Sequence, residues 1–78
     1  GNGQNGDLVI EQQENNKDII IKNDNGSGGT TAYITLDGDA VSTKIETIKV
    51  LMPNLPTSNP NVAGQLYNDS GTLKISAG

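Results

Sequence analysis

The chain has 78 residues, enough for one domain at most, and it contains no cysteine, histidine, tryptophan, phenylalanine or arginine. These absences exclude disulfide bonds, a zinc site built from nitrogen and sulfur ligands, and a nucleophile activated by an imidazole base. The net charge is -4 and the lysines are scattered singly, which argues against a nucleic-acid surface. No apolar run approaches the roughly 18 residues that a membrane helix needs, so no membrane contact is predicted.

Residues 1–6 contain only Gly, Asn and Gln. This composition predicts a flexible N-terminal lead or linker. The basic and apolar regions of a signal peptide are both missing from it.

Residues 7–52 are predicted to form a β-strand module. Short apolar clusters rich in β-branched residues alternate with turn signals such as Asn25-Gly26 and Asp37-Gly38. The first two clusters are apolar on both strand faces and therefore require cover on two sides. The predicted strands are Leu8–Glu11, Ile19–Lys22, Ala32–Leu36 and Ile45–Met52.

The stretch 42–52 is open to two interpretations. Thr43 and Glu46 have the spacing of a helical capping box, and Ile45, Ile48 and Met52 fall on one helical face. The same stretch is rich in β-branched residues, and its apolar residues also alternate as in a strand. We favour a strand that ends before Pro53 and keep a helix as the alternative.

Residues 53–62 are predicted to be an extended, Pro-rich connector, because proline donates no hydrogen bond to a β-ladder. Residues 63–78 are predicted to form a C-terminal β-hairpin with the turn Asn68–Gly71. Leu73 and Ile75 then share one face of its second strand.

Several patterns resemble ligand sites, and each is better explained as a turn. Placing Gly26 at the sixth position of a calcium loop puts Ile21 first and Ala32 last, where oxygen ligands are required. Asp37 and Asp39 would form a weak cation site only if the fold brought Asp24 to them. Residues 26–29 lack the ending of a phosphate-binding loop, and residues 68–70 match a glycosylation sequon that a turn explains better.

Carboxylate pairs for glycoside hydrolysis are available at Glu11 and Glu14 or at Asp37 and Asp39. A glycosidase also needs a deep sugar cleft, normally lined by aromatic rings, and the chain has only two tyrosines. We therefore predict that the chain is not an enzyme and has no catalytic, cofactor-binding or metal-binding residues.

The composition predicts a homo-oligomer. The chain has 21 large apolar residues, whereas Asn, Asp, Gly, Ser and Pro together number 34. Chains this small usually need disulfides, metals or partner subunits, and only the last of these remains. Disorder is the alternative, but the strong patterning of the apolar residues argues against it.

Two blocks of the sequence resemble structural proteins of tailed bacteriophages. Residues 17–22 and 24–38 are similar to a segment that recurs in such proteins, and residues 55–76 resemble a carboxy-terminal segment of head-fibre and tail-associated proteins. In the second block Asn59 and Tyr67 stand where the family commonly has Asp and Trp. The resemblance implies a virion component, often an intertwined β-rich homotrimer, and implies no catalytic residues.

We therefore expect an all-β chain of short strands and hairpins, forming an intertwined homotrimeric β-fibre or β-prism-like module. The expected function is structural, in the virion as a head fibre, tail fibre or capsid decoration, with other virion proteins as further partners. The alternatives are a module that binds a host surface or glycan, and an extracellular filament subunit assembled by β-strand addition.

Overall fold

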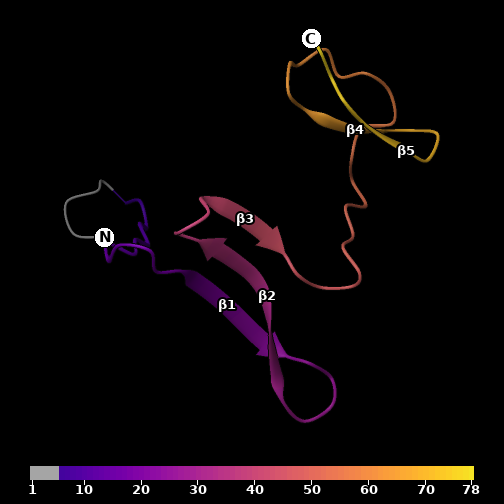
Figure 1. Ribbon diagram of the computed structural model, residues 1–78. Helices are drawn as coiled ribbons and strands as arrows, with labels where there is room; N and C mark the ends of the chain where they lie inside the picture. Colours follow the sequence, from indigo (N-terminus) through magenta and orange to yellow (C-terminus); the bar gives the residue numbers. More distant parts are fainter. Residues whose placement is uncertain (1–5) are drawn as a thin grey trace.

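The structure, a computed structural model, describes residues 6–78 and consists of strands, turns and loops. A three-stranded antiparallel sheet and a two-stranded antiparallel sheet are joined by a long segment without regular secondary structure (Figure 1). This confirms the prediction of an all-β chain. The strands are β1 Ile19–Asp24, β2 Thr30–Asp37 and β3 Ser42–Ile45 in the first sheet, and β4 Leu66–Asp69 and β5 Thr72–Ile75 in the second.

Asn25 closes the loop between β1 and β2. Its Oδ1 accepts hydrogen bonds from Ser27 N at 2.7 Å and from Gly29 N at 3.1 Å, and its own N–H donates to Gly29 O. Gly26 has a φ of 81°, a conformation that glycine adopts without steric cost. The interpretation of this stretch as a loop tip rather than a calcium loop agrees with these turn bonds.

A β-bulge interrupts the pairing of β1 with β2. Ile21 lies opposite Ile34 and Lys22 lies opposite Ala32, so Tyr33 is the extra residue on β2. The Tyr33 hydroxyl donates a hydrogen bond to Asp24 O at 2.7 Å. From Ile34 to the end of β2 the pairing is regular on both sides.

The second sheet is a tight hairpin wrapped by the segment that precedes it. Ser70 and Gly71 both have positive φ, as a two-residue type I′ turn requires, so the turn is centred on these two residues. Ser76 is 3% exposed, and its hydroxyl donates to Asn59 Oδ1 at 2.7 Å. Asn68 N donates to Pro56 O at 2.8 Å. The predicted C-terminal hairpin is confirmed, and the Pro-rich stretch is partly bound to it.

The predicted strand Leu8–Glu11 is wrong, and the predicted strand Ile45–Met52 is wrong beyond its first residue. Residues 8–11 are irregular, and the ambiguous stretch 42–52 forms β3 up to Ile45 and then neither strand nor helix. A strand exists only where a second backbone accepts and donates its hydrogen bonds. Among the described residues, no backbone–backbone hydrogen bond reaches residues 8–11 or 47–52. The predicted lead of residues 1–6 lies, except for Gly6, outside the described part.

The chain is expanded for its length. Its radius of gyration is 16.8 Å, whereas a compact domain of this length has about 11–12 Å. Its accessible surface is 6440 Å², whereas a folded monomer of this mass exposes about 4,500 Å². No hydrophobic side chain of the described residues is buried. The described part of the chain therefore has no hydrophobic core of its own.

Candidate assembly surface

One face of the three-stranded sheet is a layer of aliphatic side chains, which we call the apolar face. Strand residues two apart share a face, and paired residues lie side by side across neighbouring strands. The apolar face consists of two such rows, Ile19, Leu36 and Thr43 in the first and Ile21, Ile34 and Ile45 in the second. The described chain leaves most of this face open, because Ile21, Leu36 and Ile45 are exposed and Ile19 and Ile34 are only half-buried.

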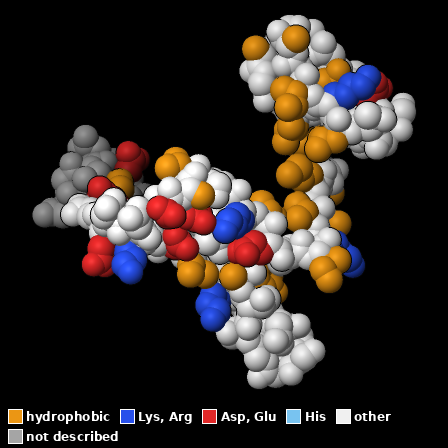
Figure 2. Space-filling view, in the orientation of Figure 1, with side chains coloured by type: hydrophobic (Ala, Val, Ile, Leu, Met, Phe, Trp, Pro, Cys, Tyr) orange, Lys and Arg blue, Asp and Glu red, His pale blue; other side chains and the backbone are white. Residues whose placement is uncertain are grey.

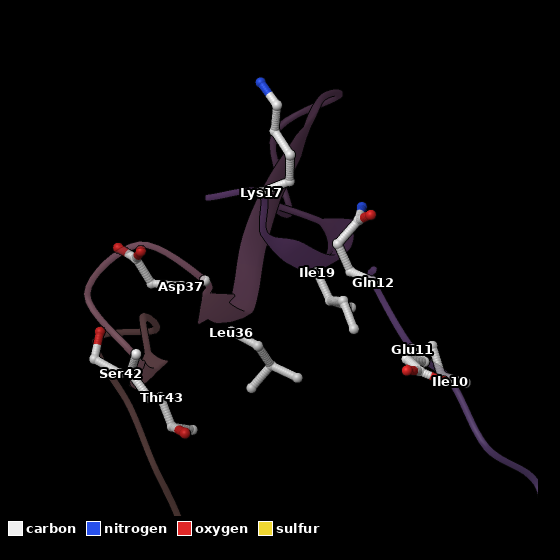
Figure 3. Close-up of a pocket in the computed structure, with 11 residues that line it drawn as sticks. Ile10, Glu11, Gln12, Lys17, Ile19, Leu36, Asp37, Ser42 and Thr43 are labelled. Carbon is white, nitrogen blue, oxygen red and sulfur yellow. The ribbon is translucent and has the colours of Figure 1, made fainter. Parts of the chain in front are cut away.

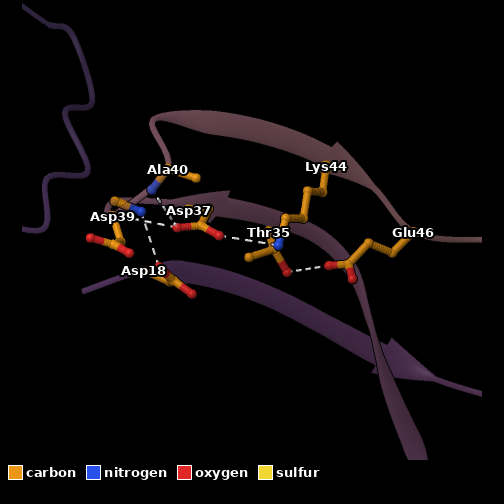
Figure 4. A network of polar contacts seen from close by, with 8 residues as sticks. Asp18, Thr35, Asp37, Asp39, Ala40, Lys44 and Glu46 are labelled. Carbon is orange, nitrogen blue, oxygen red and sulfur yellow. Dashed lines mark hydrogen bonds and ion pairs between the residues drawn. The ribbon is translucent and has the colours of Figure 1, made fainter. Parts of the chain in front are cut away.

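The opposite face of the same sheet carries a network of polar side chains (Figure 4). Lys44 Nζ lies 3.1 Å from Asp37 Oδ2, and the Thr35 hydroxyl donates a hydrogen bond to Glu46 Oε1. Asp37 Oδ1 also accepts hydrogen bonds from the N–H groups of Asp39 and Ala40, each at 3.0 Å. The network fixes the turn between β2 and β3 and the end of β3.

The one buried residue of this sheet is polar. On the central strand, Thr35 of the polar face is only 7% exposed, while its neighbour Leu36 on the apolar face is exposed. Burying apolar surface is the main force that drives folding and association. The exposed aliphatic side chains of this face are therefore available for burial.

Further apolar side chains lie at the surface outside the sheet. Figure 2 shows hydrophobic side chains along the segment between the two sheets, and this segment includes the exposed residues Ile48–Met52. Leu73 and Ile75 on β5 are exposed as well. Soluble monomers rarely expose large contiguous patches of apolar side chains. Here both sheets, and the segment between them, have exposed apolar side chains.

A shallow groove of about 450 Å³ lies at one end of the apolar face. The side chains of Ile19 and Leu36 project toward it, with Ile10 on one side and the β2–β3 turn on the other (Figure 3). Val41 from this turn completes the apolar lining, and Glu11 lies at the rim. Gly38 fixes the β2–β3 turn to the residues that precede β1. Its N–H donates a hydrogen bond to Asp18 Oδ1 at 3.0 Å, and the Lys17 backbone fills the space that a side chain at position 38 would take.

The ion pair and hydrogen bonds of Asp37 make the stability of the sheet depend on pH. The backbone N–H of Ala40 and the Lys44 ammonium lower the pKa of Asp37, and Asp37 in turn raises the pKa of Lys44. A lowered carboxyl pKa contributes stability that is present above the ordinary value of about 3.9 and is lost as the pH falls through the folded value. A raised lysine pKa contributes stability that is lost only as the pH rises through it.

We expect Asp37→Asn to reduce the acid sensitivity of the β2–β3 turn. The loss of turn-residue NMR shifts below about pH 4 should be smaller in this variant than in the wild type, because the titrating group is gone. Asp39→Asn is the matched control, since it removes the same charge from the same turn and the Asp39 carboxylate accepts no hydrogen bond from the described residues. An acid profile unchanged by Asp37→Asn and altered by Asp39→Asn would contradict the assignment.

The acidic residues considered as ligands from the sequence are not brought together. Asp24 pairs with Thr30 at one end of β2 and Asp37 lies at the other end, a separation of about 23 Å along the strand. Within residues 6–78, no group of three or more acidic side chains is placed to hold a metal ion. The same residues include no helix with the length and hydropathy to cross a membrane.

The sequence pattern identified part of the apolar face and missed the rest. The alternation of residues along β2 is enough to place Ile34 and Leu36 on one face, whereas the contributions of Ile21 and Ile45 depend on the strand register and were not predicted. The binding of Asn59 to Ser76 was missed as well, because nothing local in either residue indicates it.

No protein-family model matches the chain, and comparisons with curated proteins and with solved structures also give no match.

Proposed function

We propose that the chain is a structural component of a tailed-phage virion, a fibre or capsid-decoration module in which three copies pack their apolar faces around a threefold axis. The observation that carries the proposal is the open apolar face, on which Ile21, Leu36 and Ile45 are exposed while Thr35 on the opposite face is buried. Three such faces meeting at an axis give each copy the core that it lacks alone. The virion assignment rests on the resemblance of residues 17–22, 24–38 and 55–76 to phage structural proteins.

The exposed area supports assembly of about this size. The accessible surface of 6440 Å² exceeds that of a typical folded monomer by about 2,000 Å². A stable interface buries about 800 Å² on each partner, and each chain of a closed trimer makes two interfaces, which gives about 1,600 Å² per chain. The excess is therefore sufficient for two neighbours.

We expect a native mass of roughly 24 kDa, three times the 8.1 kDa of the chain, in sedimentation equilibrium. The unfolding midpoint should rise with protein concentration, because dissociation and unfolding are coupled. A monomer whose midpoint is independent of concentration would contradict the assembly. Peptides of the chain should also be found by mass spectrometry in purified phage particles, and their absence there would overturn the virion assignment alone.

The open edges of the three-stranded sheet favour one alternative, a filament subunit assembled by β-strand addition. Within the described residues, β1 and β3 are each paired on one side only, so both present an open strand edge. Open edges allow strand addition and hence filaments. Species that grow without limit as the concentration rises would favour this filament-forming alternative over the closed trimer.

A further inference from the structure

Residues Ile48–Met52 form an apolar segment without a binding place in the described part of their own chain. Ile48 is fully exposed, and Val50, Leu51 and Met52 are exposed as well. No backbone–backbone hydrogen bond joins this segment to any other described residue. Alternation in an extended segment places Ile48, Val50 and Met52 on one side and Lys49 and Leu51 on the other.

The chain directs this segment away from its own groove. Glu46 N donates to Tyr33 O at 2.9 Å, and the Glu46 carboxylate accepts the Thr35 hydroxyl. Because of these bonds, Glu46, the residue after β3, still lies beside β2. The groove lies at the other end of β3, next to the β2–β3 turn (Figures 1 and 3). The apolar segment therefore leaves the sheet at the end opposite to the groove.

Val41 shows that the groove is incomplete in the single chain. It has a φ of 52°, which is unfavourable for a β-branched residue, and it is 89% exposed. Because the Val41 side chain is exposed to solvent, no burial within the chain offsets the strain of its backbone. The same side chain gains contacts if a second apolar segment fills the groove that it lines.

The groove lining carries charges of both signs: Glu11 and Asp37 are acidic, Lys17 is basic, and Asp37 is already paired with Lys44. Glu11 lies at the groove rim, and Lys49 lies in the middle of the apolar segment. The two ion pairs among the described residues involve neither of them. An extended segment with Ile48 and Val50 against the aliphatic floor leaves Lys49 on the outer side, where Glu11 offers a carboxylate without an ion pair among the described residues and Lys17 is a like charge.

We propose that residues Ile48–Met52 of one copy lie in the groove formed by Ile10, Ile19, Leu36 and Val41 of the next copy, in a closed cyclic exchange. This inference rests on the proposed threefold assembly and specifies how its copies interlock. The occupant is a second copy of the same chain because the apolar segment and the apolar groove are both unsatisfied in the same molecule. Each copy then donates one segment and accepts one.

Paired cysteines test the exchange directly, because the chain has no cysteine of its own. In the double variant Leu36→Cys/Val50→Cys, a disulfide forms where the two side chains come within about 4 Å between Cβ atoms. Exchange around a ring links every chain to the next, so a covalent trimer is expected on a non-reducing gel. Each single variant yields covalent dimers at most. Leu36→Cys/Ser58→Cys is the control for random oxidation, since Ser58 is an exposed polar residue of the connector.

The outcomes separate this inference from the assembly itself. A covalent trimer with a peptide-mapped link between positions 36 and 50 supports the exchange. A native trimer that gives no such link, or links 36 to 50 only within one chain, overturns the exchange and leaves the proposed function standing. A native monomer overturns both.

Val41→Asn gives a second measurement that does not depend on oxidation. Asparagine tolerates positive φ, so this variant keeps the turn and removes the apolar wall of the groove. We expect at least a tenfold rise in the concentration at which the trimer is half dissociated. If Val41 were only a strained turn residue, Val41→Asn would leave this concentration unchanged or lower it, and either result overturns the exchange.

Discussion

Ile21→Lys is expected to convert the proposed trimer into monomers, whereas Ile20→Lys should leave it intact. The two isoleucines are adjacent on β1 and almost equally exposed in the single chain, at 51% and 53%. Ile21 lies opposite Ile34 on the apolar face, and Ile20 lies opposite Thr35 on the polar face. A charge at position 21 would be buried at the proposed threefold interface, and a charge at position 20 would remain in water.

The expected effect at position 21 is large. Loss of a buried isoleucine side chain costs about 1.5–3 kcal/mol per chain, and burial of an unpaired ammonium adds to this cost. Sedimentation velocity at equal protein concentrations measures the outcome. Equal trimer populations in the two variants would show that the apolar face of β1 is not in the interface, and dissociation by Ile20→Lys alone would place the polar face there instead.

Gly38→Ala is expected to destabilise the assembly by about 1–3 kcal/mol per chain, the usual range for an added methyl group without room. A Cβ atom at position 38 would collide with the backbone carbonyl oxygen of Lys17 and lie 3.1 Å from its carbonyl carbon. Backbone atoms cannot move aside as a flexible side chain can. The collision separates the N-terminal segment from the β2–β3 turn and thereby opens the groove.

Gly29→Ala is the matched control for this substitution. Position 29 also lies outside the positive-φ region, and its nearest neighbour is the flexible side-chain amide of Asn25 at 3.1 Å. An effect within about 0.5 kcal/mol is expected, as for most surface substitutions. Chemical denaturation of both variants at one protein concentration gives the comparison. Equal stability of Gly38→Ala and the wild type would mean that residues 17 and 38 do not pack as described.

The strands that local sequence predicts well are those whose partners are also near in the sequence. β1 and β2 are joined by an Asn-Gly loop, and β4 and β5 by a two-residue Ser-Gly turn, so turn chemistry and β-branched composition predicted both hairpins. The strand prediction failed at residues 8–11 and 46–52. These residues have strand-forming side chains but no backbone partner among the described residues, and strand propensity alone does not supply one.

Composition by itself determined that the chain is rich in β-strands, has no histidine or cysteine to bind a metal, and has little apolar area for its length. Only the tertiary structure decided where that apolar area lies. The register of β1, β2 and β3 gathers Ile21, Ile34 and Ile45 on one open face, and a shift of one residue would have turned each strand over. Strand pairing is a non-local choice between backbones, so no single segment of the sequence contains it.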